Sequence, residues 1–360
     1  MERVVPNALR VIADLKRGLS QKRVRDNAFH PQTNRRFVFV RPPGVIRRCL
    51  DPFTKDFRQS VAALGEEKLI ACIRRWLGPV SPRSPFGIGD DCAVLPAARG
   101  QQLLTVDPVI YGNHFDAAVP PRAAGAKLLK RNLSDLAAMG GEPSSAVLSL
   151  ILDARVSRRW LEQFYRGLAD CARRYRVSIV GGDLAQATGV VAASLTLLGR
   201  PVGQRVVART GARNGDWIYV TGLLGRSLQS GHHFRFQPRL AEGAWLARQS
   251  AVRAMMDMSD GLAKDLHALT PRGAMPALEA EALPLRAGAD VRHALTDGED
   301  YELLFALAAR TDRAEFERRW RRAFPSVKIQ CLGRFVSAGK LPAAAIDLAK
   351  FHGYEHLRRR

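Results

Sequence analysis

Hydrophobic and polar residues alternate along most of this chain with periods that distinguish helices from strands. Apolar positions three and four residues apart predict helices over residues 66–77, 125–139, 157–175, 261–269 and 311–324. Short apolar runs bounded by turn residues predict strands over 103–107, 146–152, 177–180, 193–198, 217–221, 301–307 and 327–332. Because the two kinds of element alternate, the sequence predicts a layered α/β (α+β) protein.

The pattern divides the chain into three parts. Residues 1–60 mix short helical stretches with basic, Pro-containing loops and carry no motif, so we expect a dispensable, poorly ordered extension or a true start codon near Val61. Residues 61–205 predict an N-terminal α/β domain and residues 206–360 a C-terminal domain. The turn Gly211–Gly215 marks the entry to the second one.

Composition narrows the class of protein. A chain of 360 residues with 46% hydrophobic content can form about two domains with their own cores. No apolar run approaches the roughly 18 residues of a membrane span, and the N-terminus lacks a secretory signal, so we expect a cytoplasmic protein that does not enter the membrane. The five scattered cysteines form no Cys-x-x-Cys pair and indicate neither disulfides nor a zinc site.

The net charge of +22 is spread too evenly to indicate a nucleic-acid site. Residues 1–60 hold 14 Lys and Arg against five Asp and Glu, a net +9, which leaves +13 for the other 300 residues. We find no basic stripe with interleaved aromatics and no helix-turn-helix or finger spacing. We therefore expect no nucleic-acid partner, although a basic N-terminal segment that binds nucleic acid stays the alternative. The field would attract small anionic substrates.

Candidate chemistry lies in a series of aspartate-bearing segments. They are Gly89-Asp90-Asp91, Asp107 at the end of a strand, Asn132 to Asp135, Gly181-Gly182-Asp183, and Asp257 to Gly261. Carboxylates where strands meet glycine-rich turns suit hard divalent cations. The chain has no Gly-x-x-x-x-Gly-Lys-[Ser/Thr] phosphate loop. Triphosphate binding through magnesium ions fits this combination, although each segment alone is more often structural.

The order of these segments resembles the thiamine-monophosphate kinase family. That family shares an ATP-binding superfamily with aminoimidazole ribonucleotide synthetase and selenophosphate synthetase. The resemblance runs from about Leu64 to the C-terminus and rests on residues 87–94, 107–115, 132–140, 181–183, 215–222, 257–262, 298–305 and 353–356.

Two branches of the superfamily match less well. Selenophosphate synthetase would show a reactive cysteine in a glycine-rich segment, whereas Cys72 lies within the amphipathic stretch before the Asp pair. The purine-pathway enzyme carries a different segment where Asn113-His114-Phe115 stands. The words Asn-Leu-Ser-Asp and Gly-Glu-Asp-Tyr-Glu-Leu favour the thiamine branch.

The resemblance implies an architecture and an activity. The fold would be the two-domain one of aminoimidazole ribonucleotide synthetase, with an N-terminal domain that forms the sheet of a homodimer and a C-terminal α/β sandwich. The activity would be that of an ATP- and Mg²⁺-dependent kinase in thiamine diphosphate biosynthesis, which phosphorylates thiamine monophosphate to thiamine diphosphate.

The resemblance also implies a role for individual residues. Several Mg²⁺ ions would be held by Asp91, Thr105, Val106, Asp107, Asp135, Asp183, Asp257 and Asp260, with Asp90 supporting its neighbour. ATP would contact Gly182, Asp183, Arg209 and Ser259. Thiamine monophosphate would contact His114, Glu299 and Tyr354, with Tyr354 stacking on the cationic ring and Glu299 offsetting its charge. Tyr354 as a plain C-terminal anchor and His114 as a structural loop residue stay open, and Tyr165 is expected to pack in the core.

Some positions depart from the family pattern. Val106 replaces a hydroxyl residue and offers only its backbone, Leu184 replaces a threonine, and Pro108 and Tyr111 are unusual before His114. The number of Mg²⁺ ions therefore stays open, and so does a non-catalytic ATP-binding paralogue. Because a phosphomonoester has its second pKa near 6, the acceptor is already anionic. We therefore expect no general base and no covalent phosphoenzyme.

Overall fold

The computed structural model describes residues 51–84, 86–89, 92–97, 100–203 and 205–355. They all belong to one compact unit, residues 41–360. Two sheets with helices against them form this unit, so the α/β class predicted from the sequence is confirmed. Residues 1–50 and the aspartates of the Asp90-Asp91 pair lie outside the described residues.

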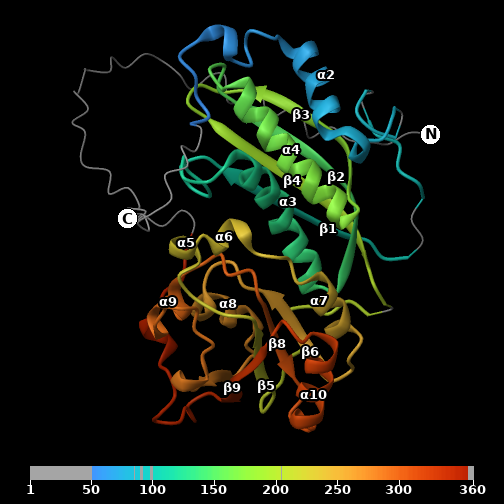
Figure 1. The fold of residues 1–360 in the computed structure, drawn as a ribbon. Coiled ribbons are helices and arrows are strands. Elements are labelled where there is room, and N and C mark those ends of the chain that lie inside the picture. Colours follow the sequence, from blue (N-terminus) through green and yellow to red (C-terminus); the bar gives the residue numbers. More distant parts are fainter. Residues whose placement is uncertain (1–50, 85, 90–91, 98–99, 204, 356–360) are drawn as a thin grey trace, which may run out of the picture. The chain divides into compact units, whose positions relative to one another are not determined.

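The first sheet is built from four strands in the order β1-β4-β2-β3. Their bounds are β1 Leu103–Ile110, β2 Gly141–Leu152, β3 Ser178–Gln186 and β4 Val191–Pro201. Neighbours run antiparallel except β2 and β3, which are parallel and joined by a helix. Helices α3 (Pro121–Ala138) and α4 (Arg158–Tyr175) pack against each other and cover one face, and α2 (Glu66–Leu77) packs on α4 (Figure 1).

Two glycines set the distance between α3 and α4. A Cβ on Gly125 would lie 1.9 Å from the carbonyl oxygen of Phe164, and one on Gly167 would lie 1.9 Å from that of Arg122. Any side chain at either position would therefore separate the helices. The close crossing fixes the position of α3 against the sheet.

The other face of this sheet carries exposed apolar residues, and none of the described helices packs on it. Side chains alternate along β1 and β2, so Thr105 and Asp107 point toward the helices while their neighbours point away. We call the exposed residues Leu104, Val106, Ile110, Val147 and Ile151 the outer face; Leu104 is 67% exposed and Val106 59%. An apolar sheet face of this kind usually marks a contact surface.

The second sheet is fully antiparallel and has helices on both faces. Its order is β6-β8-β5-β9-β7, with β5 Trp217–Thr221, β6 Val252–Asp257, β7 Ala274–Leu278, β8 Leu303–Leu307 and β9 Ile329–Ser337. Helices α8 (Leu262–Leu269) and α9 (Val291–Thr296) cover one face, and α7 (Leu240–Ala247) and α10 (Arg313–Ala323) cover the other. Short helices complete the chain: α5 Ser227–Ser230, α6 His232–Arg235, and 3-10 turns Phe57–Gln59, Gly78–Val80, Ala280–Ala282 and Leu348–Lys350.

The sequence predicted most long elements but not their ends. The helix over 66–77 and the strand over 217–221 have the predicted bounds. Helix α3 begins four residues earlier than expected, since Pro121 occupies its first turn, where a missing N–H costs nothing. Strands β6 and β7 and helices α5, α6, α7 and α9 were not predicted. None of the described helices is long and apolar enough to cross a membrane.

Residues 51–60, which the sequence assigned to the extension, contact the first sheet's helices and loops. Pro52 is buried, and its carbonyl accepts a hydrogen bond from Ser157 N at 2.6 Å. Thr54 N donates to Arg155 O at 2.9 Å, and the Phe53 ring lies 6.0 Å from that of Tyr111. The N-cap of α4 is thereby covered by this segment.

We predict that a chain starting at Val61 is less stable than one starting at Asp51. The shorter chain loses the Pro52 and Thr54 hydrogen bonds and the packing of Phe53, which together are worth about 2–4 kcal/mol. Thermal unfolding of the two truncated proteins, monitored by circular dichroism, checks this. Equal melting temperatures would contradict it.

Candidate active site

One face of helix α3 carries a row of polar side chains into the protein. Lys127, Arg131, Ser134 and Asp135 are spaced at four, three and one residues, so they project from the same side of the helix. Lys127 and Ser134 are almost completely buried. Buried charges and hydroxyls need partners, and both sheets supply them.

Three aspartates lie around this face, Asp257 buried and Asp107 and Asp135 half-buried, and we call Asp107, Asp135 and Asp257 the acidic cluster. The Arg131 guanidinium contacts Asp107 Oδ1 at 3.1 Å and donates to Pro108 O at 2.5 Å. Thr105 Oγ1 donates a short hydrogen bond to Asp135 Oδ2. Ser134 Oγ donates to Asp257 Oδ2 at 2.7 Å, so the cluster joins β1, α3 and β6.

The acidic cluster holds more negative charge than its surroundings compensate. Burial raises the pKa of Asp107 to about 6, and Arg131 only partly opposes this. Burial and the neighbouring Asp257 raise the pKa of Asp135 to about 7. Burial likewise raises the pKa of Asp257 to about 6. The positive charge of Arg209 lowers the pKa of Asp135 and Asp257, which shows that this exposed arginine lies within electrostatic reach of both.

The loop after β6 carries two further predicted residues, Ser259 and Asp260. Side chains of helix α8 hold this loop in place. The Asp265 carboxylate accepts hydrogen bonds from the backbone N–H groups of Asp260 at 3.0 Å and Gly261 at 3.2 Å. Lys264 Nζ contacts Asp260 Oδ2 at 2.7 Å. The same Lys264 nitrogen donates to Tyr354 O at 2.7 Å, and Tyr354 N donates to Asp260 O at 2.8 Å. The C-terminal segment is therefore attached to this loop.

His114 and Glu299 meet at Lys127. His114 accepts a hydrogen bond from Ile110 N at its Nδ1 atom, at 3.1 Å, and its carbonyl accepts one from Lys127 Nζ at 2.7 Å. The same Lys127 nitrogen lies 2.8 Å from Glu299 Oε2. Glu299 N in turn donates to Ser259 O at 2.7 Å. Hydrogen bonds thus connect His114 and Glu299 to the loop after β6, and the C-terminal segment with Tyr354 is attached to that same loop.

The turn that presents Glu299 is strained. Glu299 has a φ of +64° and Tyr301 a φ of +51°, and each costs about 1–2 kcal/mol for a residue with a side chain. The turn persists because Asp300 accepts hydrogen bonds from Arg286 at 2.8 Å and from Gly225 N at 3.0 Å. Non-glycine residues in such conformations concentrate at functional sites.

Two predicted metal residues, Val106 and Asp183, point away from the acidic cluster. Val106 points to the outer face, as its alternation with Thr105 and Asp107 requires. Asp183 is exposed on β3, and its register with Ser149 and, through it, Ser194 places it on the outer face as well. β3 and β1 are the two edge strands of the first sheet. Asp183 on β3 and Asp107 on β1 are therefore three strand spacings apart, which is roughly 14 Å. Asp91 lies outside the described residues.

The donor set fits magnesium only if phosphate completes the coordination. Among the residues that the structure describes, no three His, Cys, Asp or Glu side chains are grouped closely enough to hold a metal ion. Mg²⁺ in phosphoryl-transfer sites normally takes one or two carboxylates together with water and phosphate oxygens. Buried carboxylates with raised pKa and hydroxyl neighbours match that requirement.

Relatives of this chain agree on one activity. Residues 89–200 match the family model for AIR synthase related protein, N-terminal domain. A thiamine-monophosphate kinase of Rhodopirellula baltica is 37% identical over 249 residues, which cover 63% of this chain and 77% of that protein. The chain belongs to the thiamine-monophosphate kinase family.

Solved structures of the thiamine-monophosphate kinase family support the same assignment. The enzyme of Stenotrophomonas maltophilia K279a is 30% identical, with a TM-score of 0.62 over 75% of this chain and 93% of that chain. The structure of AaThiL complexed with AMPPCP and TMP is 28% identical, with a TM-score of 0.60 over 84% of this chain and 100% of that chain.

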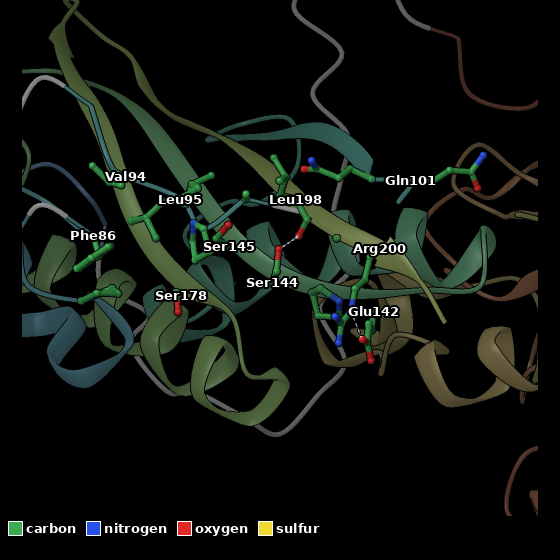
Figure 2. Close-up of a pocket in the computed structure, with 17 residues that line it drawn as sticks. Phe86, Val94, Leu95, Gln101, Glu142, Ser144, Ser145, Ser178, Leu198 and Arg200 are labelled. Carbon is green, nitrogen blue, oxygen red and sulfur yellow. Dashed lines mark hydrogen bonds and ion pairs between the residues drawn. The ribbon is translucent and has the colours of Figure 1, made fainter. Parts of the chain in front are cut away.

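A cavity of the described part of the chain is separate from the acidic cluster. It has a volume of about 1000 Å³ and lies between the segment around Phe86 and Leu95 and the ends of β2 and β4 (Figure 2). Ser145, Leu198 and Arg200 also line it. Among the predicted site residues that the structure describes, none lines this cavity.

Sequence patterns missed several residues of the site. Lys127, Arg131 and Asp265 were given no role, although each contacts a residue that was. The spacing of Lys127, Arg131 and Asp135 at four residues was a readable signal of one helix face. Asn132 of the same segment is buried, and its amide donates to Leu128 O at 2.9 Å inside the helix.

We predict that Asp135 destabilises the metal-free protein as the pH rises. A buried acid with a raised pKa binds its proton more tightly in the folded state, so the free energy of unfolding falls between about pH 4 and the folded pKa of about 7. Melting temperatures of the protein and of Asp135→Asn, measured in EDTA from pH 4.5 to 8, check this. The variant should gain relative stability up to about pH 7 and then level off. A pH-independent difference would contradict the assignment.

Proposed function

We propose that this chain phosphorylates thiamine monophosphate with ATP and forms thiamine diphosphate and ADP. The observation that carries the proposal is the acidic cluster: three buried or half-buried carboxylates from β1, α3 and β6 converge beside the residues that the family resemblance assigns to the acceptor. Membership of the thiamine-monophosphate kinase family and the likeness to AaThiL complexed with AMPPCP and TMP support the same reaction.

The proposed chemistry needs positioning more than acid–base work. An oxygen of the thiamine monophosphate phosphate forms a bond to the γ-phosphorus of ATP while the bond to the β,γ-bridging oxygen breaks and ADP leaves. The acceptor phosphate is already ionised at neutral pH because its second pKa is near 6. The residues of this chain therefore orient two polyanions and offset their repulsion.

Asp107, Asp135 and Asp257 would hold Mg²⁺, assisted by Thr105 and by Asp260 at the following loop. When bound, Mg²⁺ neutralises phosphate charge and stabilises the charge that moves to the leaving group. Thr105 and Ser134 orient two of these carboxylates by donating hydrogen bonds to them. The contribution of Asp91 and Asp183 stays part of the proposal.

ATP and acceptor would bind on the two sides of the loop after β6. Arg209 lies within electrostatic reach of the acidic cluster and suits the nucleotide phosphates, since its charge is not lost by deprotonation. Ser259 and Gly182 are the further nucleotide residues. A Cβ at Gly182 would lie 2.1 Å from Leu148 O, so β3 requires a glycine there. His114, Glu299 and Tyr354 would form the acceptor pocket.

We predict that Asp135→Asn and Asp257→Asn each reduce thiamine diphosphate formation by about a hundredfold or more. Loss of a carboxylate ligand weakens charge neutralisation in the transition state by about 3 kcal/mol. A coupled assay of ATP, Mg²⁺ and thiamine monophosphate measures this, with Asp170→Asn at an exposed ion pair on α4 as the control.

The same assay on the wild-type protein distinguishes an active kinase from a non-catalytic ATP-binding paralogue. Formation of thiamine diphosphate supports the kinase. Binding of ATP without turnover would show a non-catalytic paralogue, and near-normal turnover in both variants at saturating Mg²⁺ would refute the metal assignment.

We further propose that two copies pair through the outer face. This face carries exposed apolar residues, lies on the side of the first sheet away from α3 and α4, where none of the described helices packs, and continues along both β1 and β2. The registers align Val106 with Thr196 of β4 and Val147 of β2, so the exposed side chains form a continuous surface. Asp183 lies on the same side, so its proposed role as a ligand depends on what covers this face.

We predict that Val106→Lys shifts the protein from dimer to monomer. A buried lysine without a partner would oppose association at the centre of the outer face. Sedimentation velocity measures the change, with Leu223→Lys as the control because Leu223 is also exposed, at 44%, but lies in the C-terminal part. A wild-type monomer, or a Val106→Lys dimer of unchanged affinity, would contradict the proposal.

A further inference from the structure

Lys127 places its whole ammonium group inside the protein. Its side chain is 0% exposed, and its Nζ atom lies 2.7 Å from His114 O, 2.8 Å from Glu299 Oε2 and 3.0 Å from His233 Nδ1. A lysine ammonium has three N–H donors. Three polar atoms lie within hydrogen-bond distance of this group, and each comes from a different segment: the loop after β1, α6 and the turn before β8.

The ion pair is buried on one side and reachable on the other. The Glu299 side chain retains 19% exposure, whereas Lys127 has none. Burial opposes ionisation of Glu299, but Lys127 and His233 outweigh it and lower the pKa of this carboxyl to about 2. A ligand can thus contact the charged Glu299 carboxylate from the exposed side, while Lys127 fixes its orientation from the buried side.

We propose that Lys127 is a positioning residue for the acceptor substrate: it fixes the Glu299 carboxylate and the His114 loop in the arrangement that binds thiamine monophosphate. The inference rests on the proposed function and deepens it. Lys127 contacts neither of the two polyanions. It acts through the two residues that it holds at one nitrogen atom.

The pairing also changes what Glu299 can contribute. A glutamate with an ammonium at 2.8 Å is close to electrically neutral as a pair, so it does not act as a free counter-charge for the cationic ring of thiamine. It remains a strong, directed acceptor for an N–H donor such as the amino group of the pyrimidine ring. Recognition by hydrogen-bond geometry depends on orientation, and Lys127 supplies it.

The first test replaces Lys127 with Met, which keeps the length of the side chain and removes its charge. We expect the KM for thiamine monophosphate to rise about tenfold or more, while the KM for ATP changes less than about threefold, because only the acceptor residues lose their anchor. The melting temperature should also fall, since Glu299 and His114 O lose a buried partner.

A double variant separates positioning from stability. Lys127→Met with Glu299→Gln removes both charges, so the melting temperature should recover toward the wild-type value. The KM for thiamine monophosphate should stay raised because the oriented carboxylate is still absent. Recovery of both quantities would overturn the proposal and leave Lys127 a purely structural residue. This charge-neutral variant also keeps the test valid if Lys127→Met alone does not fold.

Lys130→Met is the matched control. Lys130 is also nearly buried on α3, but its Nζ donates to Phe234 O at 3.2 Å and does not touch Glu299. We expect its KM for thiamine monophosphate to stay within about threefold of the wild type. An equal rise in Lys130→Met, or equal effects of Lys127→Met on both substrates, would overturn the proposal. A wild-type enzyme without turnover would instead refute the proposed function.

Discussion

The site depends on a single helix that buries charge between two sheets. Helix α3 rests on the first sheet through apolar residues, pairs Arg131 with strand β1 of that sheet, and directs Lys127 and Ser134 to residues of the C-terminal part of the chain. Isolated buried charges would cost several kcal/mol each. The fold meets this cost by giving each group a partner from another segment: Glu299, Asp107 and Asp257. The relative position of the two halves of the site is thereby coupled to the pairing of these side chains.

Electrostatics divides the molecule into a basic surface and an acidic interior. The chain carries a net +22, yet three aspartates of raised pKa gather where the phosphates are proposed to bind. The surface field favours the approach of anions, whereas the bare cluster opposes their final binding. In the proposed function a divalent cation would offset the negative charge of the cluster, and Arg131 already neutralises part of that charge by its contact with Asp107.

The sequence predicted those parts whose signal is local. The amphipathic helix α2 and the short strand β5 had clear patterns and correct bounds. Strand β6 was missed because both of its faces are buried, which removes the period of two. Strand β7 contains Pro276, which argues against a central strand but is tolerated at a sheet edge, where β7 lies.

The residues of the candidate site were likewise predictable only where their signal is local. Family motifs pointed to the aspartates, and contacts between distant residues decided their surroundings. Glu299 follows Lys127 by 172 positions, and no pattern in the sequence joins them. The inward direction of Asp107 was inferable from strand alternation, whereas the ammonium behind Glu299 was not. A sequence motif can therefore assign a role to a side chain, but it does not predict which distant residue contacts that side chain.

Both faces of strand β1 carry residues with a proposed role. Its odd-numbered residues Thr105 and Asp107 face the acidic cluster, while the even-numbered Leu104 and Val106 form part of the outer face. Insertion or deletion of one residue within this strand would turn the residues on one side of the change to the opposite face, which would bring an apolar side chain to the cluster or a carboxylate to the apolar surface. Evolution of this segment is therefore confined to substitutions in place, and the length of the loop that precedes it can vary only if the register is preserved.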